Sequence, residues 1–341
     1  REPRAESREP RAESREPRAE SREPRAESRE PRAESREHYP SFYVFVKRVN
    51  EYAKLFRVTH YIKNLLIFIP LFFSLSFYEM YNVVTCIMGF IVFSLLASVV
   101  YIINDLKDVE KDRLDDVKRK RPLAAGTISP QNAITTIGIL FVVATGSIWI
   151  MDTSQHKWAA FCILAAYLAL NVIYSFGAKH IPIIDITILS SGYILRVVFG
   201  GIIIGVSISF WLYLVVLFCA FYLGLGKRRN EIIKQGASAR SVLKGYTYNF
   251  LDKNMYVCQA LCIVFYSLWS IDDSTIQRMH TKLFVFTTPV VFLILLKYSL
   301  NIERAADGDP ITVLLHDKSL CALIILYVIA AIIIVFSKAG G

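Results

Sequence analysis

Long apolar runs separated by short polar connections dominate the chain from residue 61 onward. Each run is close to the roughly 20 residues that an α-helix needs to cross about 30 Å of hydrocarbon. The pattern therefore predicts an all-α, polytopic membrane protein with nine transmembrane helices. We place these helices near 61–79, 83–103, 131–151, 157–175, 183–205, 210–226, 254–271, 282–300 and 319–337.

Two segments of different character precede the apolar runs. Residues 1–35 are five copies of the heptad Arg-Glu-Pro-Arg-Ala-Glu-Ser. The heptad has no apolar a and d positions and repeats a proline, so it cannot form a coiled coil. We expect residues 1–37 to be a disordered tail. Residues 38–60 mix aromatic and basic side chains, which predicts an amphipathic interfacial segment before a transmembrane domain of residues 61–337.

The composition supports a membrane protein and excludes other classes. The chain is 54% hydrophobic and 20% charged, whereas a soluble domain is about 45–50% apolar. An ordinary soluble enzyme, a disordered protein and a disulfide-rich secreted module are therefore excluded. The six cysteines lie within apolar runs and form no Cys-x-x-Cys pair, so we expect them to be buried rather than to bind metal.

The distribution of basic residues predicts the topology. The net charge of +10 lies outside the first 37 residues, which are neutral. Lys and Arg concentrate in 104–129 and 227–253 and are absent from 80–82, 152–156 and 206–209. By the positive-inside rule the basic connections face the cytoplasm, together with the N-terminus, and nine spans place the C-terminus outside. Nucleic-acid binding is not expected, because the basic groups are divided among short loops.

The connection after the second run carries an acidic motif. Asp105, Asp108 and Asp112 are spaced i, i+3 and i+7, which places them on one face of a helix. Three stacked carboxylates repel one another, and a divalent cation would relieve that repulsion. Carboxylates together with substrate phosphates are the usual ligands of Mg²⁺. The alternative interpretation is a solvated helix within a charged loop.

Basic residues gather near this motif and in two later cytoplasmic segments. Metal-binding carboxylates beside a basic cluster suit a substrate with several phosphates. The alternative is positive-inside topology with interfacial Lys and Arg side chains. The candidate phosphate-binding residues are Lys118, Arg119, Arg121, Lys179, Lys227 and Arg228.

Arg196 lies inside the fifth apolar run, eleven residues after Asp185. Eleven residues are close to three helical turns, so the two side chains share a helix face. An ionisable group at this depth is costly and is therefore a functional candidate. The alternative is a buried structural arginine.

Several motifs together resemble the UbiA-type intramembrane prenyltransferase superfamily. The stretch from Asn104 to Asp112, Asn-Asp-x-x-Asp-x-x-x-Asp, resembles its first signature. Further motifs resemble the decaprenyl-phosphate phosphoribosyltransferase branch: Tyr61-Ile-Lys-Asn64, Lys118-Arg-x-Arg-Pro122, Tyr174-Ser-x-x-x-Lys-His180, Ser190-Ser-Gly-Tyr-Ile-Leu-Arg196 and Gly226-Lys-Arg-Arg229. The second Asp-x-x-x-Asp of the aromatic prenyltransferases is missing, because Asp185 has no acid four residues before or after it.

The resemblance implies a UbiA-like helical bundle with a cytoplasmic-side active-site cavity in the plasma membrane. It implies a Mg²⁺-dependent pentosyltransferase that moves 5-phosphoribose from phosphoribosyl pyrophosphate (PRPP) to polyprenyl (decaprenyl) phosphate. By this resemblance, pyrophosphate would be released and the product would serve cell-envelope arabinose donor synthesis. By the same resemblance, Asp105, Asp108 and Asp112 hold Mg²⁺ with Asn104 in support. The substrate-binding residues would be Lys63, Lys118, Arg119, Arg121, Tyr174, Lys179, Asp185, Arg196, Lys227 and Arg228.

Two other functions stay open at this point. One is transfer of a prenyl group from a prenyl diphosphate to an aromatic acceptor. The other is transport of an anionic solute, although a transporter would concentrate ionisable groups near the midplane of the membrane. The oligomeric state is not indicated by the sequence.

Overall fold

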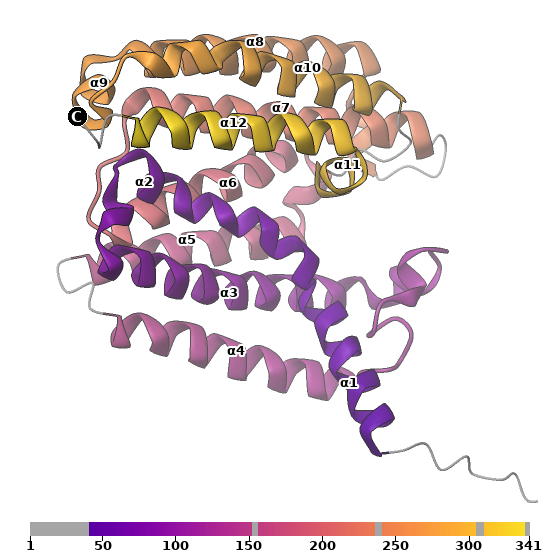
Figure 1. Ribbon diagram of the computed structural model, residues 1–341. Coiled ribbons are helices and arrows are strands. Elements are labelled where there is room, and N and C mark those ends of the chain that lie inside the picture. The colour runs from indigo at the N-terminus through magenta and orange to yellow at the C-terminus, as the bar shows by residue number, and fades with distance from the viewer. Residues whose placement is uncertain (1–40, 152–155, 236–240, 305–309, 338–341) are drawn as a thin grey trace, which may run out of the picture. The chain divides into compact units, whose positions relative to one another are not determined.

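The computed structural model of the chain describes residues 41–151, 156–235, 241–304 and 310–337 (Figure 1). The expected disordered tail lies outside the described residues. The chain divides into residues 1–44 and a body of residues 45–341. The architecture and the site below belong to this body.

Every regular element of the described residues is a helix, as the apolar runs predict. The long helices are α1 (Ser41–Phe56), α3 (Met80–Arg113), α4 (Pro130–Ile150), α5 (Lys157–Phe176), α6 (Ile184–Ile203), α7 (Phe210–Gln235), α8 (Tyr248–Ile271), α10 (Thr288–Arg304) and α12 (Lys318–Phe336). Short α-helices are α2 (Phe68–Phe73), α9 (Asp273–Met279) and α11 (Pro310–His316). Short 3₁₀ helices are η1 (Val58–Ile67), η2 (Ser76–Tyr78), η3 (Lys118–Lys120), η4 (Ala178–His180), η6 (Ser241–Gly245) and η7 (Leu283–Thr287).

Eight helices of the described residues are long and apolar enough to cross a membrane, and a ninth span arises if one bent pair is counted. The chain is therefore an integral, multi-pass membrane protein. The bent pair stands where the apolar pattern predicts the first span, near 61–79. It joins 45–56 to 58–73 at an angle of 48°, because Arg57 at the junction adopts a left-handed conformation with φ 53°. The interfacial position of residues 38–60 stays a prediction.

The acidic motif lies on a helix, as its i, i+3 and i+7 spacing predicts, and this helix is continuous with the membrane span. Helix α3 continues without interruption to Arg113, and its 34 residues span about 51 Å. Since the hydrocarbon core is about 30 Å thick, the last turns of α3 extend beyond it. In the same way α7 continues through Lys227 and Arg228 to Gln235. Both charged motifs are thus held on rigid extensions of membrane helices.

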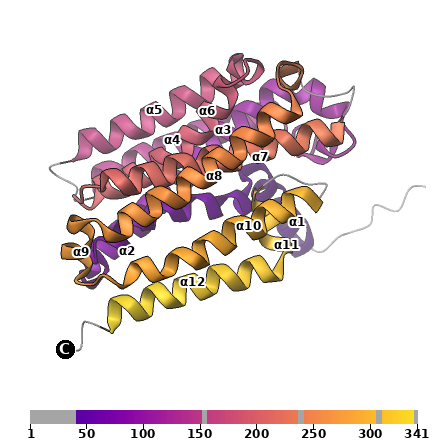
Figure 2. The same cartoon turned by 90° about the horizontal axis from the view of Figure 1, so that it is seen from above.

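Two groups of helices form the core (Figures 1 and 2). Helices α2, α3, α4, α5 and α6 share a cluster that contains Phe93, Tyr167 and Phe199. Helices α7, α8, α10 and α12 share a second cluster around Tyr222 and Met255. Helices α6 and α7 contact each other and connect the two groups.

A close approach fixes the position of η1 on α6. A Cβ atom at Gly200 would lie 2.1 Å from the backbone oxygen of Ile67, so a larger residue there would force the segments apart. Because η1 packs this closely, Lys63 and Asn64 of η1 come to the face of α6 that carries Arg196.

Candidate functional site

A cavity of about 230 Å³ opens among η1, α3, α5, α6 and α7. Most of the residues singled out in the sequence meet there, although they come from five separate segments. Those that line the cavity are Lys63, Asn104, Asp108, Asp112, Lys118, Arg121, Tyr174, Lys179, Arg196, Lys227 and Arg228. Asp105, Arg119 and Asp185 do not line it.

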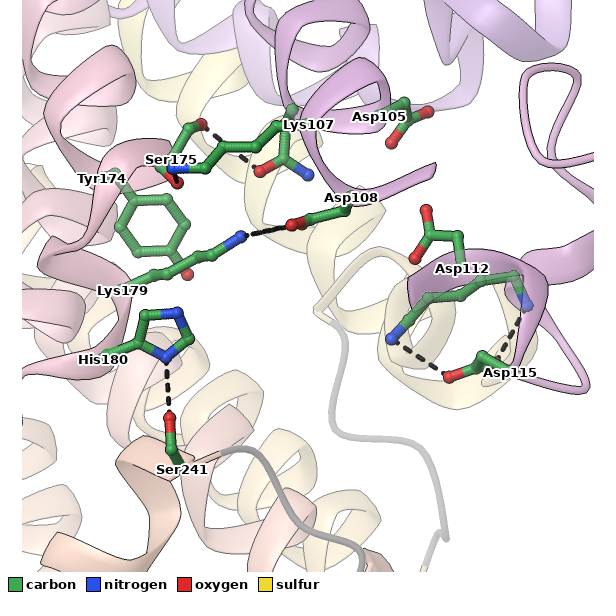
Figure 3. A network of polar contacts seen from close by, with 12 residues as sticks. Asp105, Lys107, Asp108, Asp112, Asp115, Tyr174, Ser175, Lys179, His180 and Ser241 are labelled. Carbon is green, nitrogen blue, oxygen red and sulfur yellow. Dashed lines mark hydrogen bonds and ion pairs between the residues drawn. The ribbon is translucent and has the colours of Figure 1, made fainter. Parts of the chain in front are cut away.

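Three carboxylates project from the last turns of α3 (Figure 3). Asp105 is 3% exposed and accepts from Arg57 at 2.5 Å and from Arg121 at 3.0 Å. Arg121 also donates to Asp112 at 2.6 Å and so bridges two of the three acids. The repulsion expected from their spacing is therefore relieved by arginine side chains.

The third acid of α3 is paired from the opposite wall. Lys179 of η4 donates to both oxygens of Asp108, at 2.8 and 2.9 Å (Figure 3). Next to this pair, Lys107 donates to the backbone oxygen of Ser175 at 2.7 Å. The Ser175 hydroxyl donates to the Asn104 side chain at 3.3 Å. These contacts fix the end of α5 against α3 and place Lys179 over the acidic face.

The loop after α3 is shaped by Asp115. Its Oδ1 accepts from the backbone N–H groups of Val117 and Lys118, each at 3.0 Å, and its Oδ2 pairs with the Lys118 ammonium at 3.1 Å. The backbone hydrogen bond from Lys118 lowers the pKa of Asp115 to about 2. The turn directs Lys118 to the cavity, whereas Arg119 pairs with Asp116 at 3.5 Å and is 60% exposed.

A fully buried ion pair supports the α7 side of the cavity. Asp185 is 0% exposed and accepts from Arg228 Nε at 2.6 Å and from the Tyr246 hydroxyl at 2.5 Å. Arg228 also donates to Glu231 at 2.5 Å and to the Tyr174 hydroxyl at 3.1 Å. Both oxygens of Asp185 are thus occupied by protein donors. The structure places this residue behind the cavity wall, where it positions Arg228.

Arg196 and Lys63 line the inner part of the cavity. Arg196 is 5% exposed, and its Nε donates to the Asn64 side chain at 2.7 Å. The Lys63 ammonium lies 5.9 Å from the centre of the Tyr193 ring. The inner wall therefore combines cations with aromatic faces, while the outer part of the cavity combines cations with carboxylates.

Comparison with known proteins identifies the family. The sequence model of the UbiA prenyltransferase family matches residues 65–314. The chain belongs to the UbiA prenyltransferase family. It is 30% identical over 288 residues to the decaprenyl-phosphate phosphoribosyltransferase of Corynebacterium glutamicum, covering 83% of this chain and 86% of that protein. It is 28% identical to the protein of the same name from Mycobacterium tuberculosis over 285 residues, covering 81% and 91% of the two chains.

Solved structures confirm the fold of this UbiA-family chain. A UbiA homolog from Archaeoglobus fulgidus, solved with GPP and Mg²⁺ bound, superposes with a TM-score of 0.60 at 17% identity. The match covers 84% of this chain and 99% of that one. The predicted UbiA-like bundle is thus confirmed, and the relatives identify the chain as a transferase.

The donor set of the UbiA-family site suits a hard cation that takes only part of its ligands from protein. Within the described ranges, no three His, Cys, Asp or Glu side chains gather into a complete metal centre. Asp108 and Asp112 nevertheless both line the cavity with the Asn104 side chain. Mg²⁺ is commonly held by one or two carboxylates plus substrate phosphates. The residues present therefore fit Mg²⁺ that arrives with a phosphorylated substrate.

Several cavity residues of this UbiA-family chain were not predicted from the sequence. They are Arg57, His60, Tyr101, Lys111, Asn171, Ser175, His180 and Tyr193. Arg57 was assigned to an interfacial helix, and only its left-handed backbone at the bend brings it to Asp105. His180 directly follows Lys179, and its Nδ1 shares a hydrogen bond of 2.7 Å with Ser241 (Figure 3). Burial lowers the pKa of His180.

Proposed function

We propose that this UbiA-family transferase moves 5-phosphoribose from PRPP to polyprenyl phosphate and releases pyrophosphate. The observation that carries the proposal is the charge of the cavity. Among the described residues, nine Lys and Arg side chains and two carboxylates line it: Arg57, Lys63, Lys111, Lys118, Arg121, Lys179, Arg196, Lys227 and Arg228 with Asp108 and Asp112. A single diphosphate needs fewer cations, whereas PRPP and a lipid phosphate together bring three phosphate-bearing groups. The names of the relatives support this choice.

The same cavity has an apolar wall for a lipid substrate. Ile188 and Leu189 of α6 line it together with Ala220 and Leu223 of α7. A polyprenyl chain is apolar along its whole length, so it can lie on this wall and extend to the bilayer. The phosphate at its end then meets the cations of the cavity.

The reaction needs charge stabilisation more than a strong base. A phosphate oxygen of the lipid forms a bond to the anomeric carbon of the ribose, and the bond from that carbon to the pyrophosphate oxygen breaks. The nucleophile is already an anion, so no proton has to be removed. Arg121, Lys118 and Lys179 hold the departing pyrophosphate, where fixed positive charge gains most as negative charge develops. Mg²⁺, when bound at Asp108 and Asp112, adds positive charge to the same leaving group.

The buried Asp185 supports phosphoribosyl transfer over prenyl transfer. Its oxygens are bonded to Arg228 and Tyr246, so a second acid-held metal ion is not expected at this position. We further propose that the cavity faces the cytoplasm of the plasma membrane, because the basic connections of the chain are at this end. A role in the cell envelope follows from the names of the relatives alone.

A transfer assay on the purified protein in detergent tests the proposal. Radiolabelled PRPP is offered with polyprenyl phosphate and Mg²⁺, and geranyl diphosphate with an aromatic acid is offered separately. We expect a labelled lipid product only in the first mixture. Asp108→Asn should remove most of the activity, whereas Glu110→Gln on the same helix should not, since Glu110 is exposed and pairs with Arg113. A prenylated aromatic product without any labelled lipid would refute the proposal.

A further inference from the structure

Arg196 is buried at a depth where a charge is costly. It lies on α6 eleven residues beyond Asp185, which corresponds to about 16 Å along the helix axis. Its side chain turns back by one helical turn, because Nη1 donates to the backbone oxygen of Gly192 at 2.5 Å. The guanidinium group therefore lies about 10 Å further into the bundle than Asp185.

The guanidinium group is held rigidly by neutral groups. Its Nε donates to Asn64 at 2.7 Å and its Nη2 to the Tyr167 hydroxyl at 3.3 Å. The Asn64 amide donates to Ser94 at 2.8 Å, which leaves its oxygen directed at Arg196. The rings of Phe93 and Tyr167 lie 4.8 and 5.1 Å from the guanidinium carbon. These contacts fix the orientation of the group and leave its net charge unchanged.

Arg196 differs in this respect from the other buried arginines. Arg228 is paired with Asp185 and Glu231, and Arg229 with Asp252 and Glu303. Within the described residues, Arg196 forms no ion pair. A buried positive charge that faces a cavity and is balanced only by dipoles is a strong attractor for an anion.

We propose, on the basis of the proposed function, that Arg196 forms the centre of a second anion subsite that binds a phosphate monoester at the inner end of the cavity. Lys63, whose ammonium lies near the Tyr193 ring in the same wall, adds a second cation. The subsite is separate from the outer one, where the carboxylates of α3 and the cations around them meet the pyrophosphate. Both substrates carry a phosphate monoester that fits it: the 5-phosphate of PRPP and the phosphate of the polyprenyl lipid.

Kinetics of two Arg196 variants test the subsite. Arg196→Gln should raise the KM of one substrate by roughly 10- to 100-fold, as expected for one lost charge-assisted hydrogen bond, with kcat within about threefold. Arg196→Lys keeps the charge and should raise that KM less. Arg113→Gln is the matched control, because Arg113 is half-exposed and pairs with Glu110 outside the cavity.

The two sources of the phosphate are separated by the substrate whose KM rises. If the substitution raises the KM for PRPP but not the KM for ribose 1-diphosphate, which lacks the 5-phosphate, the subsite binds the donor. A higher KM for polyprenyl phosphate alone assigns it to the acceptor. If both Arg196 variants keep both KM values within twofold of the wild type, or if Arg113→Gln changes them equally, the subsite is refuted. If Arg196→Gln does not fold, Arg196→Lys decides.

A binding measurement separates this inference from the proposed function. Inorganic phosphate should raise the thermal unfolding midpoint of the wild-type protein in detergent, and this shift should be reduced or lost in Arg196→Gln. If the wild type transfers no phosphoribose but shows the Arg196-dependent shift, the proposed function fails and the anion subsite stands. If the shift is the same in both proteins, the subsite fails whatever the enzyme transfers.

Discussion

Substitution of Asp185 by Asn tests whether this residue positions Arg228 or binds metal. The carboxylate is fully buried, and each of its oxygens has one protein donor, Arg228 at 2.6 Å and Tyr246 at 2.5 Å. Loss of one partner from a buried ion pair costs about 3–5 kcal/mol. Arg228 retains Glu231 at 2.5 Å, and the Asn oxygen still accepts from one donor. We therefore expect a loss of about 2–3 kcal/mol in the free energy of unfolding.

The expected loss is large enough to measure in detergent. For a domain of this size each kcal/mol shifts the unfolding midpoint by roughly 2–4 °C, so Asp185→Asn should lower it by about 4–12 °C. Tyr246→Phe removes two hydrogen bonds, the one that its hydroxyl donates to Asp185 and the one that it accepts from the backbone N–H of Ile183, and should cost about 2 kcal/mol. The KM for PRPP should rise in Asp185→Asn, because Arg228 loses the contact that directs it to the cavity.

The Mg²⁺ dependence of the same variant decides between the two roles. If Asp185 only positions Arg228, the Mg²⁺ concentration for half-maximal activity should be the same in Asp185→Asn and in the wild type. A tenfold higher Mg²⁺ requirement with an unchanged unfolding midpoint would refute the positioning role. This result is expected for a metal ligand, because replacing its carboxylate by a neutral amide weakens the binding of the metal. Tyr246→Phe should leave the Mg²⁺ requirement unchanged in either case.

Three further predictions follow from single contacts. Lys179→Gln should raise the KM for PRPP in the transfer assay by roughly tenfold, because it removes one charge-assisted contact to a phosphate; Lys179→Arg should restore part of it. Gly200→Ala should give little folded protein by size-exclusion chromatography, because the new Cβ would lie 2.1 Å from the backbone oxygen of Ile67. Gly138→Ala is the control and should fold normally, because no neighbouring atom lies within 4 Å of its Cβ position. The folded state lowers the pKa of His180, so its neutral form stabilises the fold: this contribution is complete above the unfolded pKa of about 6.5 and is lost as the pH falls through the lower folded pKa. The unfolding midpoint of His180→Asn should therefore fall less between pH 7 and pH 5 than that of the wild type.

The sequence was sufficient for the fold class because membrane helices are specified locally. Every long apolar run after residue 80 corresponds to a helix of the structure. In hydrocarbon the backbone N–H and C=O groups need hydrogen-bond partners, and an α-helix supplies them within a single segment. The bend of the first span was not predicted from the apolar run near 61–79. It depends on one left-handed residue, Arg57, and on the packing of η1 against Gly200. Neither feature has a signal in hydropathy.

The sequence predicted which residues gather in the candidate site but not which of them contact one another. The motifs around Asp108, Lys118, Lys179 and Lys227 do meet in one cavity. The sequence could not show that Asp185 is behind the wall or that Arg119 faces solvent, because both depend on which way a helix face or a turn is directed. Arg57 was missed for a related reason: it is 48 residues from Asp105 in the sequence and reaches it only through the bend.

The ion pairs of the site suggest how the substrate and the metal bind together. Asp105 and Asp112 share Arg121, and Asp108 holds Lys179. On the proposed function, Asp108 and Asp112 would hold Mg²⁺, while Arg121 and Lys179 would hold phosphate oxygens of the pyrophosphate that enters with it; the metal would supply the positive charge that the two side chains now supply to these carboxylates. Each charge then keeps an opposite charge throughout, so no uncompensated ion has to be buried. Metal without phosphate would leave Lys179 without its carboxylate and Arg121 with Asp105 alone. Mg²⁺ alone should therefore bind weakly, and calorimetry should show that pyrophosphate raises its affinity.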